Sequence, residues 1–391
     1  MRILFVAMAN SIHTIRWINQ IADQGWDIHL FPVEDWGIHS ELRNVTVHNF
    51  LGRKPTKIDK SVRVIGSWPF SRTSAFVKRI INRFLPSVID RKLARIINQI
   101  KPDIIHSLEI QHAGYITLNA REQIGENFPS WIVTNWGSDL FIFGRLLEHV
   151  KKVKAVLSFC DYYDCECHRD VKLALSYGFK GRVLPILPNT GGFDINKMCI
   201  LRQSGKTSER RLIILKGYQG WAGRALVGLR AIELCADMLK DYQVAIYLAN
   251  EDVKIAAELI SQSTGIPINI IPYSSHEDIL RLHGRARISI GLSIGDGAST
   301  SMLEAMVMGS FPIQSCTACA DEWIKDGING MIVNPEDPQL ISASIKLAIS
   351  DDFLVDRASE LNIQIARERL DYQTIKQQVV SIYENIAIKQ H

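Results

Sequence analysis

The sequence predicts an α/β protein made of two doubly wound domains with parallel sheets. Two observations support this fold class. Short apolar runs typical of buried strands alternate with helix-length stretches from the first residue onward, and the alternation restarts after a turn-rich break near mid-chain. The length of 391 residues is too great for one ordinary domain and suits two. Such patterning indicates sheets covered by helices on both faces.

The first half alternates strand and helix signals in regular order. The run Arg2–Ala7 is short and apolar, and Ile12–Ala22 repeats apolar residues at helical spacing until Gly25 ends it. Helix-length stretches separate the further strands expected at Asp27–Pro32, Asp103–His106, Trp131–Thr134, Val153–Ser158 and Arg182–Leu187.

The second half begins after a passage rich in proline and glycine at 185–192 and a polar stretch at 202–211. The strands expected there are Leu212–Lys216, Gln243–Leu248, Ile268–Ile271, Ala286–Leu292 and Phe311–Gln314. The helices expected there are Arg224–Met238, Asp252–Ser261, His276–His283 and Ser299–Met308. A last helix, Tyr372–Ile386, suits either domain. We expect the domains to face each other across a cleft, with ligands at the carboxyl ends of the strands.

The bulk composition is that of a globular protein, with 47% apolar and 22% charged residues. Its net charge of +4 does not by itself imply a nucleic-acid partner. The start Met1–Ala7 lacks the pattern of a signal peptide, and no run of about 18 apolar residues is present to span a membrane. We therefore expect a cytoplasmic protein.

The seven cysteines are most simply explained as buried thiols of a reducing compartment. Two groups are closely spaced: Cys160, Cys165 and Cys167 with His168, and Cys316 with Cys319. A structural zinc site would need two such pairs to converge. The first group is interpreted as part of an amphipathic helix, and no metal is expected.

Positive charge is concentrated between Gly52 and Lys101, where 13 basic residues stand against 2 acidic ones. This segment carries +11 and the rest of the chain −7. Apolar residues recur at helical spacing over Phe76–Ile89, with Pro86 interrupting, so we expect a basic amphipathic helix. Two interpretations stay open: binding to an anionic lipid surface, and docking on the core with a solvated basic face. A nucleic-acid site is the weaker alternative, because no recognition motif accompanies the charge.

The first candidate site is the glycine-rich turn from Lys216 to Arg224, which joins a strand to a helix. Glycines such as Gly217 let backbone N–H groups approach a phosphate, and the helix N-terminus adds positive potential. Lys216 and Arg224 would neutralise a diphosphate. The turn matches neither a Walker loop nor a GxGxxG motif, and tight packing alone is the competing explanation.

The second candidate is the stretch from Gly295 to Met306, again between a strand and a helix. Ser299, Thr300 and Ser301 are residues that begin helices, and Glu304 follows as in a capping box. Capping alone would explain Ser301 and Glu304. It does not explain a carboxylate at Asp296 in a glycine-bracketed turn, so we expect a second phosphate-binding helix N-terminus.

Here the sequence resembles a known family. The stretch Asp296–Glu304, followed by Ala305, Met306 and Gly309, is similar to the acidic–seven residues–acidic signature of the family 4 retaining glycosyltransferases (glycosyl transferases group 1). That family has the GT-B fold of two facing Rossmann-like domains. Further similar motifs, in the family's order, are Gly137-Ser138-Asp139, Pro188-Asn189 with Phe193-Asp194, and the run Glu322–Val333.

The resemblance implies a donor site in the second domain, 196–369. Glu304 would bind the ribose hydroxyls, and Asp296 would lie by the donor sugar. Lys216 and Arg224 would hold the diphosphate, and the region of Tyr273 would border the base. The backbone from Gly297 to Thr300 would face the sugar or the phosphates, Ala298 and Ser299 included.

The first domain, 1–195, would bind the acceptor, and the C-terminal helix, 370–391, would pack back on it. Asn10 and Ser11 would line the acceptor side. The sequence departs from the family at three places: Asp296 replaces the usual glutamate, the basic pair is reversed and more widely spaced, and Trp136 stands where histidine is common. A polar contact to the donor sugar would then come from Asp139 or His106; His112 is the less favoured histidine.

The reaction that the resemblance implies is transfer of a sugar from a nucleotide-diphosphate sugar to a hydroxyl acceptor. Retention by same-face attack is preferred over a covalent intermediate on Asp296, and neither a metal nor a cofactor is expected. A saccharide or lipid-linked acceptor, in surface polysaccharide or glycolipid synthesis, would suit the basic segment. The alternatives are a GT-B sugar-nucleotide epimerase, a phosphorylase, and a catalytically dead sugar-nucleotide-binding protein.

Overall fold

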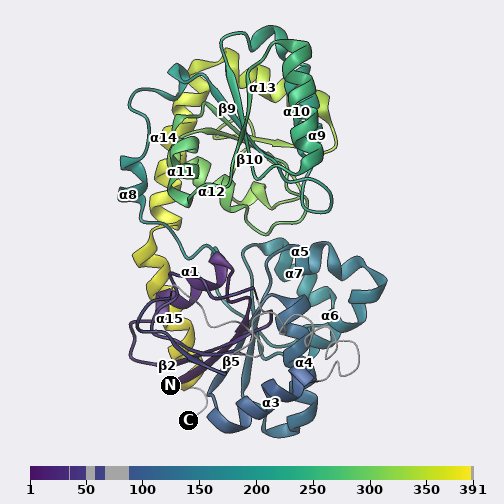
Figure 1. The fold of residues 1–391 in the computed structure, drawn as a ribbon, viewed down its shortest axis with the longest axis vertical. Helices are drawn as coiled ribbons and strands as arrows, with labels where there is room; N and C mark the ends of the chain where they lie inside the picture. The colour runs from purple at the N-terminus through teal and green to yellow at the C-terminus, as the bar shows by residue number, and fades with distance from the viewer. Residues whose placement is uncertain (35, 50–57, 67–87, 389–391) are drawn as a thin grey trace. The chain divides into compact units, whose positions relative to one another are not determined.

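The computed structural model describes residues 1–34, 36–49, 58–66 and 88–388, and it divides into two compact units (Figure 1). Unit 1 comprises Met1–Gly192 and Gln373–His391, and unit 2 comprises Phe193–Tyr372. Each unit carries one sheet whose paired strands are parallel. The boundaries lie a few residues from those expected, and the last helix belongs to unit 1.

The sheet of unit 1 has the order β4-β3-β2-β1-β5-β6-β7-β8. Its strands are β1 (Arg2–Ala7), β2 (Asp27–Pro32), β3 (Thr46–His48), β4 (Arg63–Ile65), β5 (Ile104–Leu108), β6 (Ser130–Thr134), β7 (Tyr162–Asp164) and β8 (Arg182–Val183). The strands at the edge beyond β2, which are short and partly polar, were not expected. The central strand β1 is the most apolar because helices cover both its faces.

The helices of unit 1 form two layers. They are α1 (Ile12–Ile21), α3 (Val88–Ile100), α4 (Tyr115–Ile124), α5 (Ser138–Phe141), α6 (Leu147–Phe159), α7 (His168–Ser176) and α15 (Tyr372–Ile388). Side chains alternate along β1: Ile3 and Phe5 join the core with α1 and α15, whereas Leu4 and Val6 join the core with α3, α4 and α6. This confirms the doubly wound prediction for the first half.

Two sequence-based assignments in unit 1 are wrong. Val153–Ser158, expected as a strand, lies within α6 (Leu147–Phe159). Val153, Val156 and Leu157 are buried while the neighbouring lysines are exposed, so the apolar residues follow a helical period that a six-residue window does not reveal. The closely spaced cysteines also do not share one helix: Cys160 ends α6 and Cys167 precedes α7 (His168–Ser176).

The sheet of unit 2 has the order β11-β10-β9-β12-β13-β14. Its strands are β9 (Leu212–Lys216), β10 (Gln243–Tyr247), β11 (Ile268–Ile271), β12 (Ile288–Gly291), β13 (Phe311–Ser315) and β14 (Met331–Val333). The helices are α8 (Ile195–Ile200), α9 (Ala225–Glu233), α10 (Glu251–Thr264), α11 (His276–Arg285), α12 (Thr300–Met308), α13 (Pro338–Ser350) and α14 (Asp352–Arg369). All five strands expected in the second half are present.

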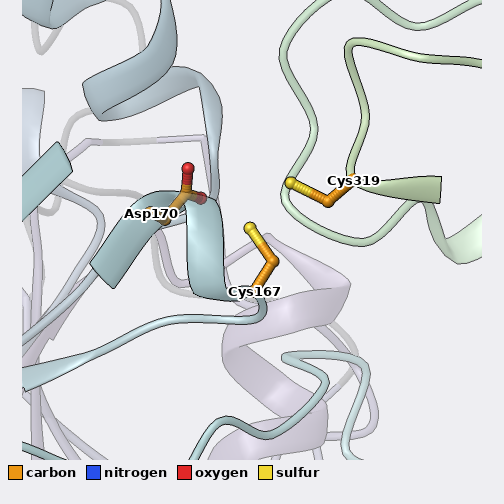
Figure 2. A group of neighbouring side chains, drawn as sticks. All are labelled: Cys167, Asp170 and Cys319. Atoms are coloured by element: carbon orange, nitrogen blue, oxygen red, sulfur yellow. The ribbon is translucent and has the colours of Figure 1, made fainter. Parts of the chain in front are cut away.

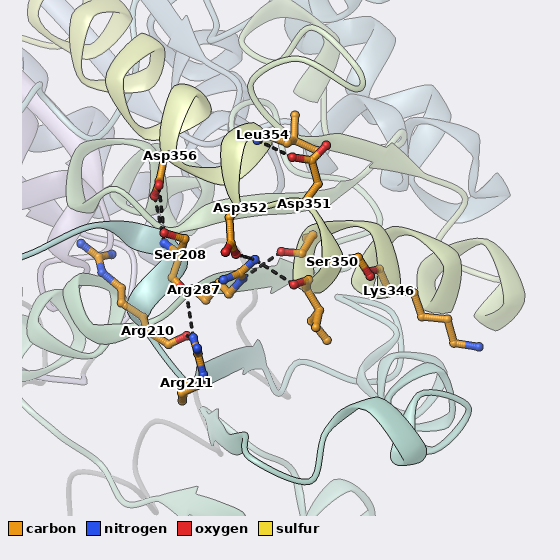
Figure 3. A network of polar contacts seen from close by, with 12 residues as sticks. Ser208, Arg210, Arg211, Arg287, Lys346, Ser350, Asp351, Asp352, Leu354 and Asp356 are labelled. Carbon is orange, nitrogen blue, oxygen red and sulfur yellow. Dashed lines mark hydrogen bonds and ion pairs between the residues drawn. The ribbon is translucent and has the colours of Figure 1, made fainter.

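A buried arginine anchors the amino-terminal edge of the unit 2 sheet (Figure 3). Arg287 precedes β12, and its guanidinium donates to the carbonyl oxygens of Ala348 and Ile349 at 2.8 and 2.9 Å and to the carboxylate of Asp352 at 2.7 Å. The same guanidinium donates to the carbonyl of Ser208. These contacts hold the end of α13 and the start of α14 against the sheet. The amino-terminal edge is therefore filled by structural hydrogen bonds, and a ligand would bind at the carboxyl edge.

Most of the basic segment Gly52–Lys101, including most of the expected helix Phe76–Ile89, lies outside the described residues. The parts within them are residues 58–66, which include β4, and α3 with the residue after it; α3 buries Leu93 and Ile97 in the core and exposes Arg91 and Arg95. Helix α3 therefore docks on the core with a solvated basic face, and the interpretations of the expected helix Phe76–Ile89 stay predictions. Among the described helices, none is both long and apolar enough to pass through a membrane.

Candidate functional site

Lys216 and Asp296 meet at the carboxyl edge of the unit 2 sheet. Lys216 is the last residue of β9, and Asp296 lies in the loop after the neighbouring strand β12. The Lys216 Nζ is 3.8 Å from an Asp296 carboxylate oxygen and 4.3 Å from the centre of the Tyr218 ring. Only 12% of the lysine side chain is exposed. The structure thus brings together two of the predicted residues, with a cation held in a confined position.

Two glycines of the Lys216–Arg224 turn are required by backbone packing. A Cβ atom on Gly217 would lie 2.7 Å from Ala249 Cα, and one on Gly223 would lie 2.6 Å from the Tyr218 carbonyl oxygen. No side chain larger than hydrogen fits at either position without a backbone shift. The packing explanation therefore accounts for these two glycines, and Lys216 is the residue of the turn that contacts Asp296.

Arg224 is engaged with its own turn. It is the N-cap residue of α9, and its guanidinium pairs with Glu336 and donates to the carbonyl oxygens of Gly220 and Gly223. The predicted partnership of Lys216 and Arg224 on one ligand is thus not preformed, because Glu336 already balances the arginine charge. Glu336, which sequence reasoning missed, lies over a hundred residues away and carries no local signal.

The amino-terminal turn of α12 has no side-chain cap. Ser299 is the N-cap residue in extended conformation, but its hydroxyl bonds to that of Ser301 at 2.9 Å instead of to the backbone. Gly297, Ala298 and Ser299 are buried, and Thr300 is half-buried. The expected capping box is absent, so the helix end keeps its anion-binding character.

Glu304 is buried on α12 between two histidines of α11. Its Oε1 is 2.6 Å from Nε2 of His276, and its Oε2 is 3.9 Å from Nε2 of His283. Both histidines were missed as site residues. Their seven-residue separation within the predicted helix places them on one face, and this is the signal that could have revealed them.

The charges of these groups affect one another's pKa values, so the groups lie close together. Burial lowers the pKa of His283 to about 4; the charge of Glu304 opposes this shift, and those of His276 and Lys216 add to it. Burial raises the pKa of Tyr247, at the end of β10, and the charge of Glu304 raises it further. Tyr273, expected near the base, is 98% exposed before α11. The end of β9 and the segment that follows the adjacent strand β12 thus supply a cation, two carboxylates and an uncapped helix end.

The predicted acceptor-side residues gather at the carboxyl edge of the unit 1 sheet. Asn10 and Ser11 are half-buried between β1 and α1, and Trp136 follows β6. The ring of His13, in the first turn of α1, lies 5.7 Å from that of Trp136. The ends of β1, β5 and β6 are adjacent in the sheet, so these residues share one edge.

Asp139 is buried near this edge and hydrogen-bonds to the segments that follow β5 and β6. Its carboxyl group accepts the backbone N–H groups of Trp136 at 3.2 Å and Ile110 at 3.1 Å. Burial, and next the charge of Glu109, raise the pKa of Asp139 to about 8. Its environment therefore favours the protonated form more than water does. A buried acid with backbone partners fits a positioning role better than a direct contact with substrate.

Glu109 and His112 form a feature that sequence reasoning did not identify. Glu109 has a positive φ of 84°, and its carboxylate accepts the N–H groups of His112 and Ala113 at 2.6 Å. The hydrogen bond with Glu109 raises the pKa of His112, whose ring is exposed. A strained residue that starts a short π-helix at a strand end is typical of functional sites.

His106 has a structural environment. It is fully buried, with Nδ1 2.7 Å from the Tyr383 hydroxyl and Nε2 2.6 Å from that of Thr134. The chain of bonds continues from Trp17 to Tyr383 at 2.9 Å and from Thr134 to Asp164 at 2.8 Å. Burial lowers the pKa of His106 to about 3. This network connects α15 to the sheet of unit 1. Because both ring nitrogens of His106 are engaged and the side chain is buried, His106 is not placed to contact a substrate.

The cysteines are free thiols, and most are buried. Figure 2 shows Cys167 immediately before α7, with Asp170 in the first turn of that helix. Asp170 accepts from the side-chain amide of Asn135 at 2.9 Å, and its other carboxylate oxygen pairs with Arg169 at 2.8 Å. Cys319, also labelled there, follows β13 in unit 2 with a positive φ of 47°. The prediction of buried thiols is confirmed for Cys160, Cys165, Cys167, Cys235 and Cys319.

Comparison with known solved structures gives the same fold over the whole chain. Sucrose-phosphate synthase from Thermosynechococcus elongatus superimposes with a TM-score of 0.73 at 12% identity, covering 99% of each chain. HepE of Anabaena, solved with UDP-glucose, has a TM-score of 0.69 at 15% identity, covering 98% of this chain and 100% of its own. The UDP-forming α,α-trehalose-phosphate synthase of Burkholderia xenovorans, solved with glucose-6-phosphate, has a TM-score of 0.70 at 12% identity, covering 99% and 100%.

Among curated proteins no sequence match is found. Two family models do match, one in each half of the chain. The model described as glycosyl transferase 4-like matches residues 2–162, and that described as glycosyl transferases group 1 matches residues 229–369. The second range contains Asp296, Glu304 and both α11 histidines. The chain therefore belongs to the glycosyltransferases, joining a glycosyl transferase 4-like domain to a group 1 domain in the GT-B fold.

Proposed function

We propose that the protein is a retaining glycosyltransferase that moves a sugar from a nucleotide-diphosphate sugar to a hydroxyl acceptor. One observation carries the proposal: Lys216, Asp296, Glu304 and the uncapped start of α12 lie together at the carboxyl edge of the unit 2 sheet. Ligands of doubly wound sheets bind at this edge. A confined cation and a helix N-terminus are the two features that a diphosphate requires.

In this proposal each group binds a different part of the nucleotide-sugar donor. The ammonium of Lys216 and the backbone N–H groups at 297–300 hold the diphosphate, and the carboxylate of Glu304 accepts the ribose hydroxyls. Asp296 binds hydroxyl groups of the donor sugar. Burial strengthens these interactions, because few water molecules compete for the same partners.

The chemical step breaks the bond between the anomeric carbon and the phosphate oxygen while the acceptor oxygen bonds to the same face of that carbon. The departing phosphate oxygen receives the proton of the acceptor hydroxyl. Negative charge grows on the diphosphate as the bond breaks, so Lys216 and the α12 terminus stabilise the transition state more than the bound donor.

The structural neighbours support a uridine nucleotide as the first donor to test. HepE was solved with UDP-glucose, and the trehalose-phosphate synthase is a UDP-forming enzyme. We propose a saccharide or lipid-linked acceptor, as in surface polysaccharide or glycolipid synthesis. The concentration of positive charge in residues 52–101 supports an acceptor at an anionic membrane surface on the cytoplasmic side.

The test is a panel of nucleotide sugars, headed by UDP-glucose, scored by the rise in melting temperature of the full chain. The donor that stabilises the protein is then incubated with candidate saccharide and lipid-linked acceptors, and nucleotide release is followed. A transferase releases UDP faster when acceptor is present. Release that is equally fast without acceptor would indicate an epimerase or hydrolase, and no stabilisation by any member would contradict the proposal.

A further inference from the structure

Helix α11 presents two histidines to one carboxylate. His276 and His283 lie two helical turns apart on the same face, and both ring Nε2 atoms are directed at Glu304. The start of α11 is held by a capping box, in which the Ser275 hydroxyl accepts from the Asp278 N–H at 3.2 Å. His276 is therefore the first residue of a well-anchored helix, and its backbone position is defined.

The two histidines act on opposite oxygens of Glu304. His276 Nε2 lies 2.6 Å from Oε1, a full hydrogen bond. His283 Nε2 lies 3.9 Å from Oε2, which is beyond hydrogen-bond distance, and this buried nitrogen has no hydrogen-bond partner among the described residues. Burial keeps His283 neutral, and its Nδ1 contacts the Ser289 hydroxyl at 3.3 Å. Of these two histidines, His276 thus makes the full hydrogen bond to the carboxylate.

Exposure separates the roles of the three side chains. His276 has 44% of its side chain exposed, Glu304 has 7%, and His283 is fully buried. The imidazole of His276 is thus a solvent-exposed neighbour of a buried carboxylate. A glutamate has three rotatable side-chain bonds, so a fixed donor on one oxygen determines which way the other oxygen is presented.

We propose that His276 is a positioning residue of the donor site, which holds the carboxylate of Glu304 in the orientation that reads the ribose hydroxyls. The inference rests on the proposed function, because it takes Glu304 as the group that contacts the nucleotide ribose. It adds that ribose recognition is shared between α11 and α12, with His276 acting through Glu304.

The test measures UDP binding by calorimetry and transfer kinetics for the full chain and its variants. In His276→Ala we expect the Kd for UDP and the KM for the donor to rise about tenfold with kcat little changed, because ribose contacts are equal in ground and transition states. His276→Gln, whose amide nitrogen reaches a similar place, should restore most of the affinity. Glu277→Ala is the matched control, since Glu277 is the next residue of α11, is exposed, and pairs with Arg281 on the surface.

The decisive readout is the preference for UDP over 2′,3′-dideoxy-UDP, which a purely structural role would not change. This preference should fall in His276→Ala, be abolished in Glu304→Ala, and persist in His276→Gln and Glu277→Ala. Should His276→Ala fold poorly, His276→Asn, too short to reach Glu304, replaces it. Unchanged affinity and ribose preference in the variant would overturn the inference alone, whereas a wild-type protein that binds no nucleotide of the donor panel would remove the proposed function with it. Should another nucleoside diphosphate of the panel bind in place of UDP, the same assays use that nucleotide and its 2′,3′-dideoxy form.

Discussion

The two sheets of this glycosyltransferase share one architecture, yet the polar groups at their carboxyl edges have different partners. In unit 2 the edge holds a confined ammonium, Lys216, beside Asp296 and an uncapped helix terminus. In unit 1 the edge holds buried carboxyl groups, Glu109 and Asp139, whose oxygen atoms accept backbone N–H groups of the surrounding loops. The same topology thus carries an edge with groups available to an anion and an edge whose acids are used internally.

This difference shows that a carboxylate at a strand end is not by itself a substrate contact. Asp139 and Asp296 each lie five residues after the last residue of a strand, and nothing in the sequence distinguishes their surroundings. The folded structure distinguishes them: Asp139 is buried and accepts two backbone N–H groups, whereas Asp296 is half-buried and lies near Lys216. Three substitutions test whether the contrast holds.

The largest effect is expected for Asp139→Asn, measured as stability against pH. Asparagine mimics the protonated acid. The folded-state pKa of Asp139, about 8, lies above its ordinary value of 3.8, so wild-type stability falls as pH rises between these values. The variant lacks this loss, which is up to about 1.4 kcal/mol per pH unit. Relative to wild type, the variant should therefore become progressively more stable as the pH rises from about 5 to about 8.

Denaturant unfolding at several pH values gives this comparison. Asp237→Asn serves as the control, because Asp237 is exposed and hydrated in both states. A constant difference between Asp139→Asn and wild type over the pH range would mean that the carboxyl is ionised when folded, and the two edges would then be alike.

A smaller effect, on catalysis instead of stability, is expected for Lys216→Ala. Removing the cation should lower kcat/KM for transfer by at least about 100-fold, or about 2.7 kcal/mol, because charge grows on the diphosphate in the transition state. The control is Lys240→Ala, an exposed lysine that precedes the amino end of β10 and not a carboxyl end of the sheet. Near-normal transfer by the Lys216 variant would show that the unit 2 edge is not the phosphate site.

The smallest effect is expected for Arg224→Ala. Because Glu336 and two loop carbonyls already occupy its guanidinium, its loss should reduce transfer only about tenfold, or about 1.4 kcal/mol. Steady-state kinetics of Arg224→Ala beside Glu336→Ala separate the two roles. A loss as large as that of Lys216→Ala would indicate that Arg224 leaves Glu336 and turns to the donor when it binds.

Much of the fold was predictable, and particular residues show where prediction ended. The strands of unit 2 and the central strands of unit 1 can be predicted, because each is an apolar run between turns. The segment Val153–Ser158 was misread because a short apolar run looks the same in a strand and on one face of a helix. His106 was expected at the end of a strand, but β5 continues to Leu108, and Tyr383, which hydrogen-bonds its ring, lies 277 residues away.

By itself, the sequence determined the two doubly wound domains, the glycosyltransferase signature from Asp296 to Glu304, and the lysine that ends β9, because periodicity and spacing are local properties of the chain. Only the tertiary structure decided which of these polar groups are available to a ligand. It buried His106 and Asp139, paired Arg224 with Glu336, and placed His276 against Glu304, since burial and long-range hydrogen bonds depend on residues that meet only when the chain folds.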